Sequence, residues 1–327
     1  MNQEEINKFK QNFEFLENEI GKVIVGLSDT IRLTLATIFA GGHTLLEGAP
    51  GLGKTLLVRS IAECMGLSFK RIQFTSDLMP SDVTGTQVLS EDENNKRTFK
   101  FQRGPIFANI VLADEVNRAG PKTQSSLLEA MEEKQVTVLG HTHKLPEPFF
   151  VLATQNPIEL EGTYPLPEAQ LDRFLVKLLV SPPSAAELNE ILNRTTGQKK
   201  AQIKAFANKE ESAKAILQMR ELVKKVIVAP AVQDVLVSMV FSLDPNSNTC
   251  TSLVNQYVKF GPGPRGAQAV MMISKVLALL DGRANIAYED IKTAIVPALR
   301  HRMILNFQAE ADGVTADNII SEVKDAS

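Results

Sequence analysis

The sequence has few cysteines, no long apolar run and no strong excess of either charge. Its two cysteines, Cys64 and Cys250, lie far apart and outside any Cys-x-x-Cys pattern, which argues against a disulfide framework or a structural zinc site. The apolar runs are too short to span a bilayer, and the polar N-terminus lacks a signal-peptide pattern. A net charge of −3 gives no overall basic field for nucleic acid. We therefore expect a cytoplasmic protein without a membrane span.

The 327 residues divide into two regions of different character. Short apolar strands alternate with helical patterns up to about residue 182, which predicts an α/β fold with a mostly parallel sheet. Two prolines then break the last strand, and Ser184 with Glu187 forms a Ser-x-x-Glu capping box for a new helix. Beyond this point helical patterns dominate and strand signals are absent. We predict an α/β core over residues 1–182 and a smaller helical domain over residues 183–327.

Local patterns predict the elements of the core. Apolar residues from Ile6 to Ile20 recur at helical spacing, so the chain should open with an amphipathic helix that packs on the protein's own core. Ser28 is a candidate cap for the next helix. Residues 86–104 should form two strands around a polar turn at residues 91–95, and residues 135–145 a hairpin. Sheet strands are predicted at residues 43–48, 69–74, 110–113, 149–156 and 173–180.

The segment GAPGLGKT lies between a predicted strand and a predicted helix. It matches the pattern G-x-x-x-x-G-K-[ST] in the context that a phosphate-binding P-loop requires. Glycines let backbone N–H groups surround a phosphate, and the helix N-terminus adds positive potential. Lys54 should reach the β- and γ-phosphates of a nucleotide, and the Thr55 hydroxyl should bind Mg²⁺. The predicted binding residues are Gly48, Ala49, Pro50, Gly51, Leu52, Gly53, Lys54 and Thr55.

Two adjacent carboxylates, Asp114 and Glu115, follow the buried strand in the stretch IVLADEVNRAG. A strand that merely ends in acidic residues at the surface would be common. Together with a P-loop, however, the pair supplies what the site still lacks at the carboxyl ends of parallel strands, where α/β proteins bind ligands. Asp114 is the expected second Mg²⁺ partner, and Glu115 is placed to orient or deprotonate the attacking water.

Four segments in this order, GAPGLGKT, GPIFANIVLADEVNRA, LATQNP and EGTYPLPEAQLDRF, resemble the MoxR family of AAA+ ATPases. The resemblance extends from about residue 25 to about residue 300. It implies a P-loop AAA+ core, with a parallel β-sheet flanked by helices, followed by a smaller all-α lid domain. The two hairpin segments resemble the helix-2 insert and the hairpin before sensor 1 in the branch that contains MoxR proteins and magnesium chelatases.

The resemblance also assigns roles to individual residues. Residues 24–26, with Val25 and Gly26, resemble the segment that lines the adenine pocket. Asn156 matches the sensor 1 polar residue, which holds the attacking water. Arg173 matches the arginine finger, the alternative being a surface cation paired with Asp172. Arg265 matches sensor 2, with the subunit that it serves left open, and the role of the nearby Arg118 is also open.

The resemblance implies ATP and Mg²⁺ as cofactors. It also implies that the subunits assemble into a ring, with six as the expected number of subunits. It further implies chaperone-like work on a protein client, with proteins that carry von Willebrand factor A domains as candidates. One alternative is a nucleotide-gated binding module with slow hydrolysis. Another is a nucleic-acid motor or loader of the same branch, against which the acidic start of SEDENNKR argues. His141 and His143 alternate on a predicted hairpin without further metal ligands, so we interpret them as exposed hairpin residues.

Overall fold

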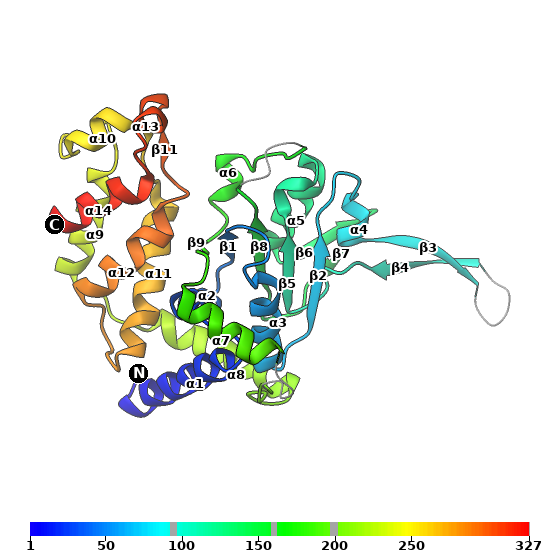
Figure 1. Ribbon diagram of the computed structural model, residues 1–327. Helices are drawn as coiled ribbons and strands as arrows, with labels where there is room; N and C mark the ends of the chain where they lie inside the picture. Colours follow the sequence, from blue (N-terminus) through cyan, green and yellow to red (C-terminus); the bar gives the residue numbers. More distant parts are fainter. Residues whose placement is uncertain (92–96, 158–161, 197–201, 327) are drawn as a thin grey trace.

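The computed structural model describes residues 1–91, 97–157, 162–196 and 202–326. Its centre is a five-stranded parallel sheet in the order β2-β5-β8-β1-β9 (Figure 1). The middle strands are buried almost completely, which explains why they read as continuous apolar runs rather than as alternating patterns. The sheet strands are β1 (Thr44–Glu47), β2 (Phe69–Gln73), β5 (Ile110–Asp114), β8 (Phe150–Gln155) and β9 (Val176–Leu179).

Successive residues of the strands enter two separate hydrophobic clusters, one on each face of the sheet. Leu112 packs with the first three helices, whereas its neighbour Val111 packs with α5 on the opposite face. The helices of the core are α1 (Gln3–Gly21), α2 (Ser28–Ala40), α3 (Lys54–Cys64), α4 (Pro80–Thr84), the 3-10 turn η1 (Val116–Arg118), α5 (Pro121–Glu133) and α6 (Glu168–Leu171). The α/β fold predicted from the sequence is therefore confirmed. The cap predicted at Ser28 is wrong, because Leu27 occupies the N-cap position and no side chain caps this helix.

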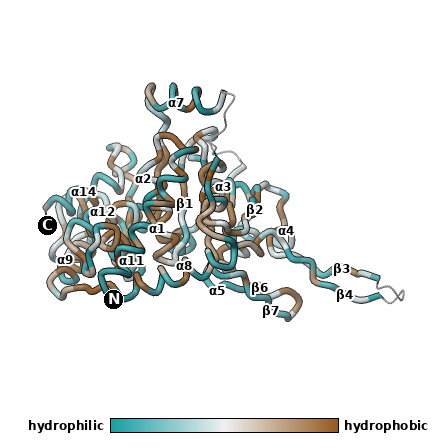
Figure 2. The backbone as a smooth tube through the Cα atoms, turned by 90° about the horizontal axis from the view of Figure 1, so that it is seen from below, coloured by the Kyte–Doolittle hydropathy of each residue, from teal (hydrophilic) through white to brown (hydrophobic). Residues whose placement is uncertain are grey.

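Two antiparallel hairpins extend from the core. One is formed by β3 (Gly85–Glu91) and β4 (Arg97–Arg103), and the other by β6 (Gln135–Val138) and β7 (His141–Lys144). The first projects well beyond the body of the molecule (Figure 2). The predicted polar turn lies outside the described residues except for Glu91. His143 stacks on Phe101 of the first hairpin with ring centroids 4.0 Å apart, which joins the two hairpins at their bases.

Helices dominate the region after β9. They are α7 (Ala185–Thr196), α8 (Lys209–Lys224), α9 (Pro230–Ser242), α10 (Ser252–Tyr257), α11 (Pro264–Leu280), α12 (Tyr288–Leu299), α13 (Phe307–Ala311) and α14 (Ala316–Ala326). The expectation that strands are absent here is wrong, since β10 (Val258–Phe260) pairs with β11 (Ile304–Leu305). Segments this short are below the length at which alternation can be recognised.

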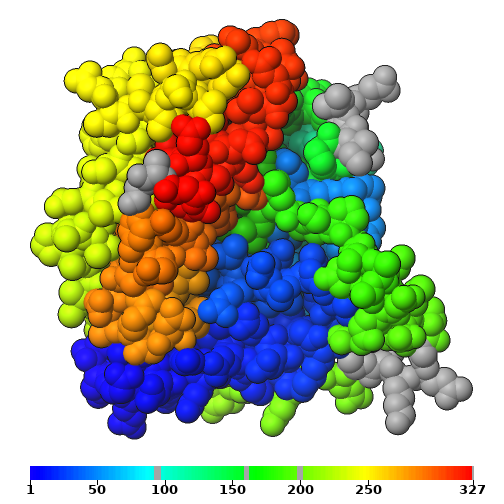
Figure 3. All heavy atoms as spheres, turned by 60° about the vertical axis from the view of Figure 1, so that its left-hand side comes forward, coloured from blue at the N-terminus to red at the C-terminus, as the bar shows by residue number. Residues whose placement is uncertain are grey.

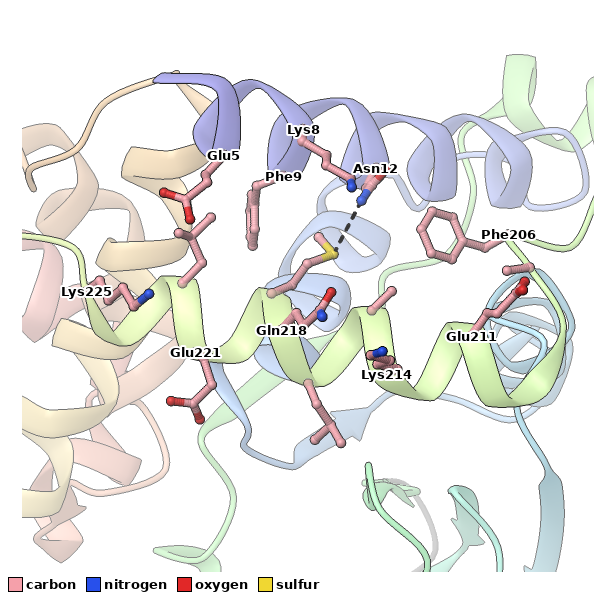
Figure 4. A pocket seen from close by; sticks show the side chains of 15 residues that line it. Glu5, Lys8, Phe9, Asn12, Phe206, Glu211, Lys214, Gln218, Glu221 and Lys225 are labelled. Carbon is pink, nitrogen blue, oxygen red and sulfur yellow. Dashed lines mark hydrogen bonds between the residues drawn. The ribbon is translucent and has the colours of Figure 1, made fainter. Parts of the chain in front are cut away.

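The C-terminal helices pack on the N-terminal helices as well as on each other. α8 and α11 both contact α2, and α11 also contacts α1. In the space-filling view the orange helices α11 and α12 lie directly above the blue N-terminal helices (Figure 3). A hollow of about 1130 Å³ lies between α1 and α8, with Phe9 and Phe206 along it (Figure 4). The division into domains at residue 182 stays a prediction.

Candidate functional site

The glycine-rich loop joins β1 to α3 at the carboxyl edge of the sheet. Its first residue is fixed to the neighbouring strand, since the Gly48 N–H donates to the Gln155 carbonyl at 3.3 Å. Gly53 has a φ of 77° immediately before α3, a left-handed conformation that glycine adopts without strain. The loop therefore turns sharply into a helix N-terminus, the arrangement in which backbone N–H groups bind an anion.

Lys54 is held inside this loop. Its side chain is nearly buried, and its ammonium group donates a hydrogen bond to the Gly48 carbonyl. Burial lowers the pKa of Lys54, while the carboxylates of Asp114, Glu115 and Glu47 oppose that shift. The ammonium group thus lies between the loop and the acidic residues, where it can contact the terminal phosphates of a nucleotide.

Asp114 is a buried carboxylate whose two oxygens have different partners. Oδ1 accepts a hydrogen bond from the Thr154 hydroxyl at 2.6 Å, which ties the carboxylate to the adjacent strand. Oδ2 accepts from Arg71 Nη2 at 2.7 Å and lies 3.5 Å from the Thr55 hydroxyl. A carboxylate and a hydroxyl at this separation are oxygen ligands of the kind that Mg²⁺ prefers. The donor set predicted from the sequence therefore fits the ion.

Glu115 leaves the strand in an unusual conformation. Its φ of 56° and ψ of 50° are left-handed, which costs energy in a residue that has a side chain. Its N–H donates to the Thr154 hydroxyl at 2.8 Å, so Thr154 supports both acidic residues. Its carboxylate accepts hydrogen bonds from Gln73 Nε2 at 2.9 Å and from Arg118 Nη1 at 3.1 Å. These contacts orient the carboxylate at the carboxyl edge and give Arg118 a partner there.

The strand order determines where Asn156 lies. It follows β8 directly, and β8 is flanked by β5, which ends in Asp114, and by β1, which leads into the glycine-rich loop. Asn156 is 5% exposed. In the strand order, Asn156 therefore lies between the end of β5 and the start of the glycine-rich loop, and its role as sensor 1 stays a prediction.

A pocket of about 200 Å³ adjoins the glycine-rich loop. Val25 and Gly26 line it, together with Gly51 to Gly53 and side chains of α7. Gly26 has a φ of 74°, and a Cβ there would lie 2.6 Å from the carboxylate carbon of Glu187. The predicted capping box holds this glutamate, because the Ser184 N–H donates to its carboxylate at 2.7 Å. The predicted nucleobase residues are thus brought next to the phosphate-binding loop.

Arg173 and Arg265 lie at the opposite, amino edge of the sheet. Arg173 precedes β9, and two residues later the Leu175 N–H donates to the His43 carbonyl at the start of β1. Arg265 is the second residue of α11. Both guanidinium groups pair with Glu132 at the end of α5, at 2.9 Å for Arg173 and 3.0 Å for Arg265. The partner of Arg173 is therefore Glu132 rather than Asp172.

Arg302 fixes the residues on either side of Arg173. Its side chain is nearly buried, and it donates to Asp172 Oδ1 at 2.7 Å and to the carbonyls of Asp172 and Phe174 at 3.0 and 2.8 Å. Burial lowers the pKa of Arg302 and Asp172 opposes the shift. A pocket of about 300 Å³ opens between Arg173, Arg265 and Arg302.

The two groups of charged residues cannot meet within one chain. β1 separates them, and its four residues rise about 13 Å from the amino edge to the carboxyl edge. The structure brings together the glycine-rich loop, Asp114, Glu115 and Asn156. It brings Arg173 and Arg265 together elsewhere.

Sequence reasoning missed Arg71, Gln73, Thr154, Glu132 and Arg302. The first three sit at or near the carboxyl ends of β2 and β8, so a search for polar residues at predicted strand ends would have found them. Nothing in the local sequence marks Glu132 or Arg302, because their partners lie far away along the chain.

Two protein-family models match segments of the chain. Residues 43–176 match the ATPase family associated with various cellular activities (AAA), and residues 250–323 match the AAA lid domain. The chain is 39% identical to Chaperone MoxR1 of Mycobacterium tuberculosis over 305 residues, which cover 93% of this chain and 79% of that protein. The chain belongs to the MoxR family of AAA+ ATPases.

Two further similarities cover nearly the whole chain. The uncharacterised protein YeaC of Bacillus subtilis is 43% identical over 309 residues, 94% of this chain and 91% of YeaC. A crystal structure of a Cytophaga hutchinsonii protein, provisionally assigned as an ATPase, has a TM-score of 0.89 and 38% identity, covering 98% of this chain and 95% of that one. Within the described ranges, none of the helices is both long enough and apolar enough to cross a membrane.

Proposed function

We propose that this MoxR-family ATPase hydrolyses ATP with Mg²⁺ at the interfaces of a ring of six subunits, and uses the resulting motion to remodel or mature a protein client. One observation carries the proposal. The phosphate-binding loop with its acidic pair and the two arginines lie at opposite edges of one sheet. A head-to-tail ring brings the carboxyl edge of one subunit against the amino edge of the next, which completes a site that a single chain leaves divided.

Each residue then has a defined role. Val25 and Gly26 contact the nucleobase, and Gly48 to Thr55 enclose the phosphates with Lys54 on the terminal pair. Thr55 and Asp114 would hold Mg²⁺, which would neutralise charge on the phosphates. The Glu115 carboxylate takes a proton from the attacking water, which the Asn156 amide holds in place.

The next subunit completes the site. Its Arg173 and Arg265 stabilise the negative charge that develops on the transferred phosphoryl group. Both arginines act in trans in this proposal, because Glu132 holds them side by side at the same edge.

Exposed apolar side chains on the two hairpins support the proposal that the client is a protein. Leu89 is 55% exposed, Phe99 72% and Leu139 74%. Exposed apolar surface of this kind suits protein contacts better than nucleic-acid contacts, which rely on basic groups along the phosphate backbone. The word chaperone in the name of the relative MoxR1 is consistent with this reading. A client with a von Willebrand factor A domain and a cytoplasmic location both remain predictions.

A subunit-mixing experiment tests the shared site. Arg173→Ala should lower turnover about 10³–10⁵-fold, because an arginine finger contributes that much to phosphoryl transfer. Glu115→Gln should be nearly inactive as well. When the two variants exchange subunits, some interfaces pair an intact Glu115 with an intact Arg173, and activity should return. The measurement is the steady-state ATPase rate against the mixing ratio, with light scattering to confirm mixed rings.

The control is Lys54→Ala mixed with Glu115→Gln. These two residues belong to the same half of the site, so this pair should show no recovery at any ratio. If mixed rings form and the Arg173→Ala and Glu115→Gln pair also stays inactive, the arginine does not act in trans and the proposed site is wrong.

A further inference from the structure

Glu132 is the meeting point of the two arginines. One oxygen of its carboxylate, Oε2, lies 2.9 Å from Arg173 Nη2, and the other, Oε1, lies 3.0 Å from Arg265 Nη2. The two arginines come from positions 92 residues apart, one beside β9 and the other on α11. A single carboxylate therefore joins the core to the C-terminal helices at this edge.

Electrostatics explains why the pair needs this carboxylate. Two guanidinium groups on opposite sides of one side chain repel each other, and a negative charge between them reduces that repulsion. Arg265 is also in the first turn of a 17-residue helix, where the helix dipole disfavours a cation. Asp172 is farther from Arg265, at 3.7 Å, and already binds Arg302 at 2.7 Å.

The end of α5 holds Glu132 in position. His43 is buried, and its Nδ1 accepts a hydrogen bond from the Val151 N–H at 2.9 Å, so its proton is on Nε2. Nε2 then donates to the Met131 carbonyl at 3.3 Å, next to Glu132. The helix end is thus fixed to β8, although the Glu132 carboxylate itself is 39% exposed.

We propose that Glu132 is a positioning residue that holds Arg173 and Arg265 together as one unit for the terminal phosphate of the neighbouring subunit's nucleotide. The proposal rests on the proposed function, because it assumes that the two arginines act in trans. The Glu132 carboxylate lies between the two guanidinium groups, where the terminal phosphate would otherwise have to bring them together. A terminal phosphate carries more negative charge than a carboxylate and has three oxygens. Both guanidinium groups therefore move from Glu132 to the phosphate, and they are already side by side when they do so.

The variant Glu132→Gln tests this role. It removes the negative charge and keeps the shape. Nucleotide affinity measured by calorimetry should be unchanged, because the subunit's own P-loop is intact. The maximal turnover rate should fall about 10- to 100-fold, the usual result of misplaced catalytic groups. The matched control is Glu133→Gln, the same change at the next, exposed position of the same helix, which should turn over like the unchanged protein.

Mixing separates positioning from a general structural defect. Glu132→Gln subunits keep Glu115, so they should regain activity when mixed with Glu115→Gln subunits, which supply an intact Glu132, Arg173 and Arg265. They should not regain activity with Arg173→Ala subunits, because no interface then holds both arginines correctly. A general structural defect would not follow this pattern of partners.

The outcomes distinguish this inference from the proposed function. If Arg173→Ala and Glu115→Gln fail to complement each other, the trans site itself is wrong. If they complement but Glu132→Gln turns over normally, or loses activity that no partner restores, only the role of Glu132 is wrong. Glu132→Asp keeps the charge with a shorter reach, so its rate should lie between those of Glu132→Gln and the unchanged protein. A rate for Glu132→Asp at or below that of Glu132→Gln would contradict a role for the charge.

Discussion

The two edges of the central sheet carry charged residues in different ways. At the carboxyl edge, a backbone loop and a buried carboxylate are fixed by hydrogen bonds to the neighbouring strand β8, from Gly48 to the Gln155 carbonyl and from Thr154 to Asp114. At the amino edge, the partly exposed Arg173 and Arg265 are both held by the side chain of Glu132. The first arrangement suits a fixed binding site, whereas the second suits groups that must move toward a ligand from outside the chain.

A large effect on turnover at the carboxyl edge would sharpen this comparison. Glu115→Gln should keep ATP binding and lower turnover about 10²–10⁴-fold, because an amide cannot accept the proton of the attacking water. Calorimetry and steady-state ATPase assays measure the two quantities. Asp114→Asn is the matched comparison, and its defect should lessen at high Mg²⁺. Turnover of Glu115→Gln within a few-fold of the unchanged protein would remove Glu115 from the mechanism.

A large effect on stability is expected at the amino edge. Arg302→Ala removes the guanidinium group that donates to the carboxylate and the carbonyl of Asp172, so the free energy of unfolding should fall by about 3 kcal/mol. Urea denaturation measures it. Arg97→Ala removes an exposed pair with Glu91 and should change stability by less than about 0.5 kcal/mol. Equal losses for the two variants would mean that Arg302 does not hold this edge together.

The amino edge should also make stability depend on pH. Burial lowers the pKa of His43 from 6.5 to about 4 in the folded chain. Between these values the unfolded chain binds a proton and the folded chain does not, so lowering the pH favours unfolding. The free energy of unfolding should be constant above about pH 6.5 and should fall by about 3 kcal/mol toward pH 4 on account of this residue.

Denaturation curves collected across this pH range measure the effect. The variant His43→Gln cannot titrate there, and it should show a shallower decline even if its stability at pH 7 is lower. The buried His301, whose pKa burial also lowers, remains in both proteins and contributes equally to each curve. Parallel curves for the two proteins would show that His43 is not responsible.

The smallest expected effect concerns Arg71, which pairs with Asp114 from an exposed position. A guanidinium group on this carboxylate competes with Mg²⁺ for the same oxygen. Arg71→Ala should therefore lower the Mg²⁺ concentration needed for half-maximal turnover, by less than about fivefold, because exposed ion pairs contribute little energy. A titration with Mg²⁺ at saturating ATP measures it. A higher Mg²⁺ requirement would show that Arg71 supports metal binding instead.

The carboxyl edge could be predicted from the sequence because its residues are local. Gly48 to Thr55 are contiguous, and Asp114 and Glu115 end a strand that is recognisable from three apolar residues. The parallel topology then requires these ends to meet. The conformation of Glu115 could not be predicted, because the hydrogen bonds that support it come from Gln73 and Thr154 on two other strands.

The amino edge could be predicted only in part. Family resemblance pointed to Arg173 and Arg265, but no pattern linked them to Glu132, since their contact depends on how the C-terminal helices pack on the core. The short strands β10 and β11 were missed for a related reason. Two or three residues show no periodicity, so only tertiary packing identifies them.

A divided site also affects inheritance. If Arg173 serves the next subunit, a single defective allele silences interfaces in proportion to its share of the subunits, whichever half of the site it damages. An allele that damages both halves, Glu115 and Arg173 together, silences each interface that it enters from either side. Activity then falls with the square of the remaining normal share. In a cell that carries both alleles, a mutation that damages both halves of the site would therefore lower ATPase activity more than a mutation that damages one half.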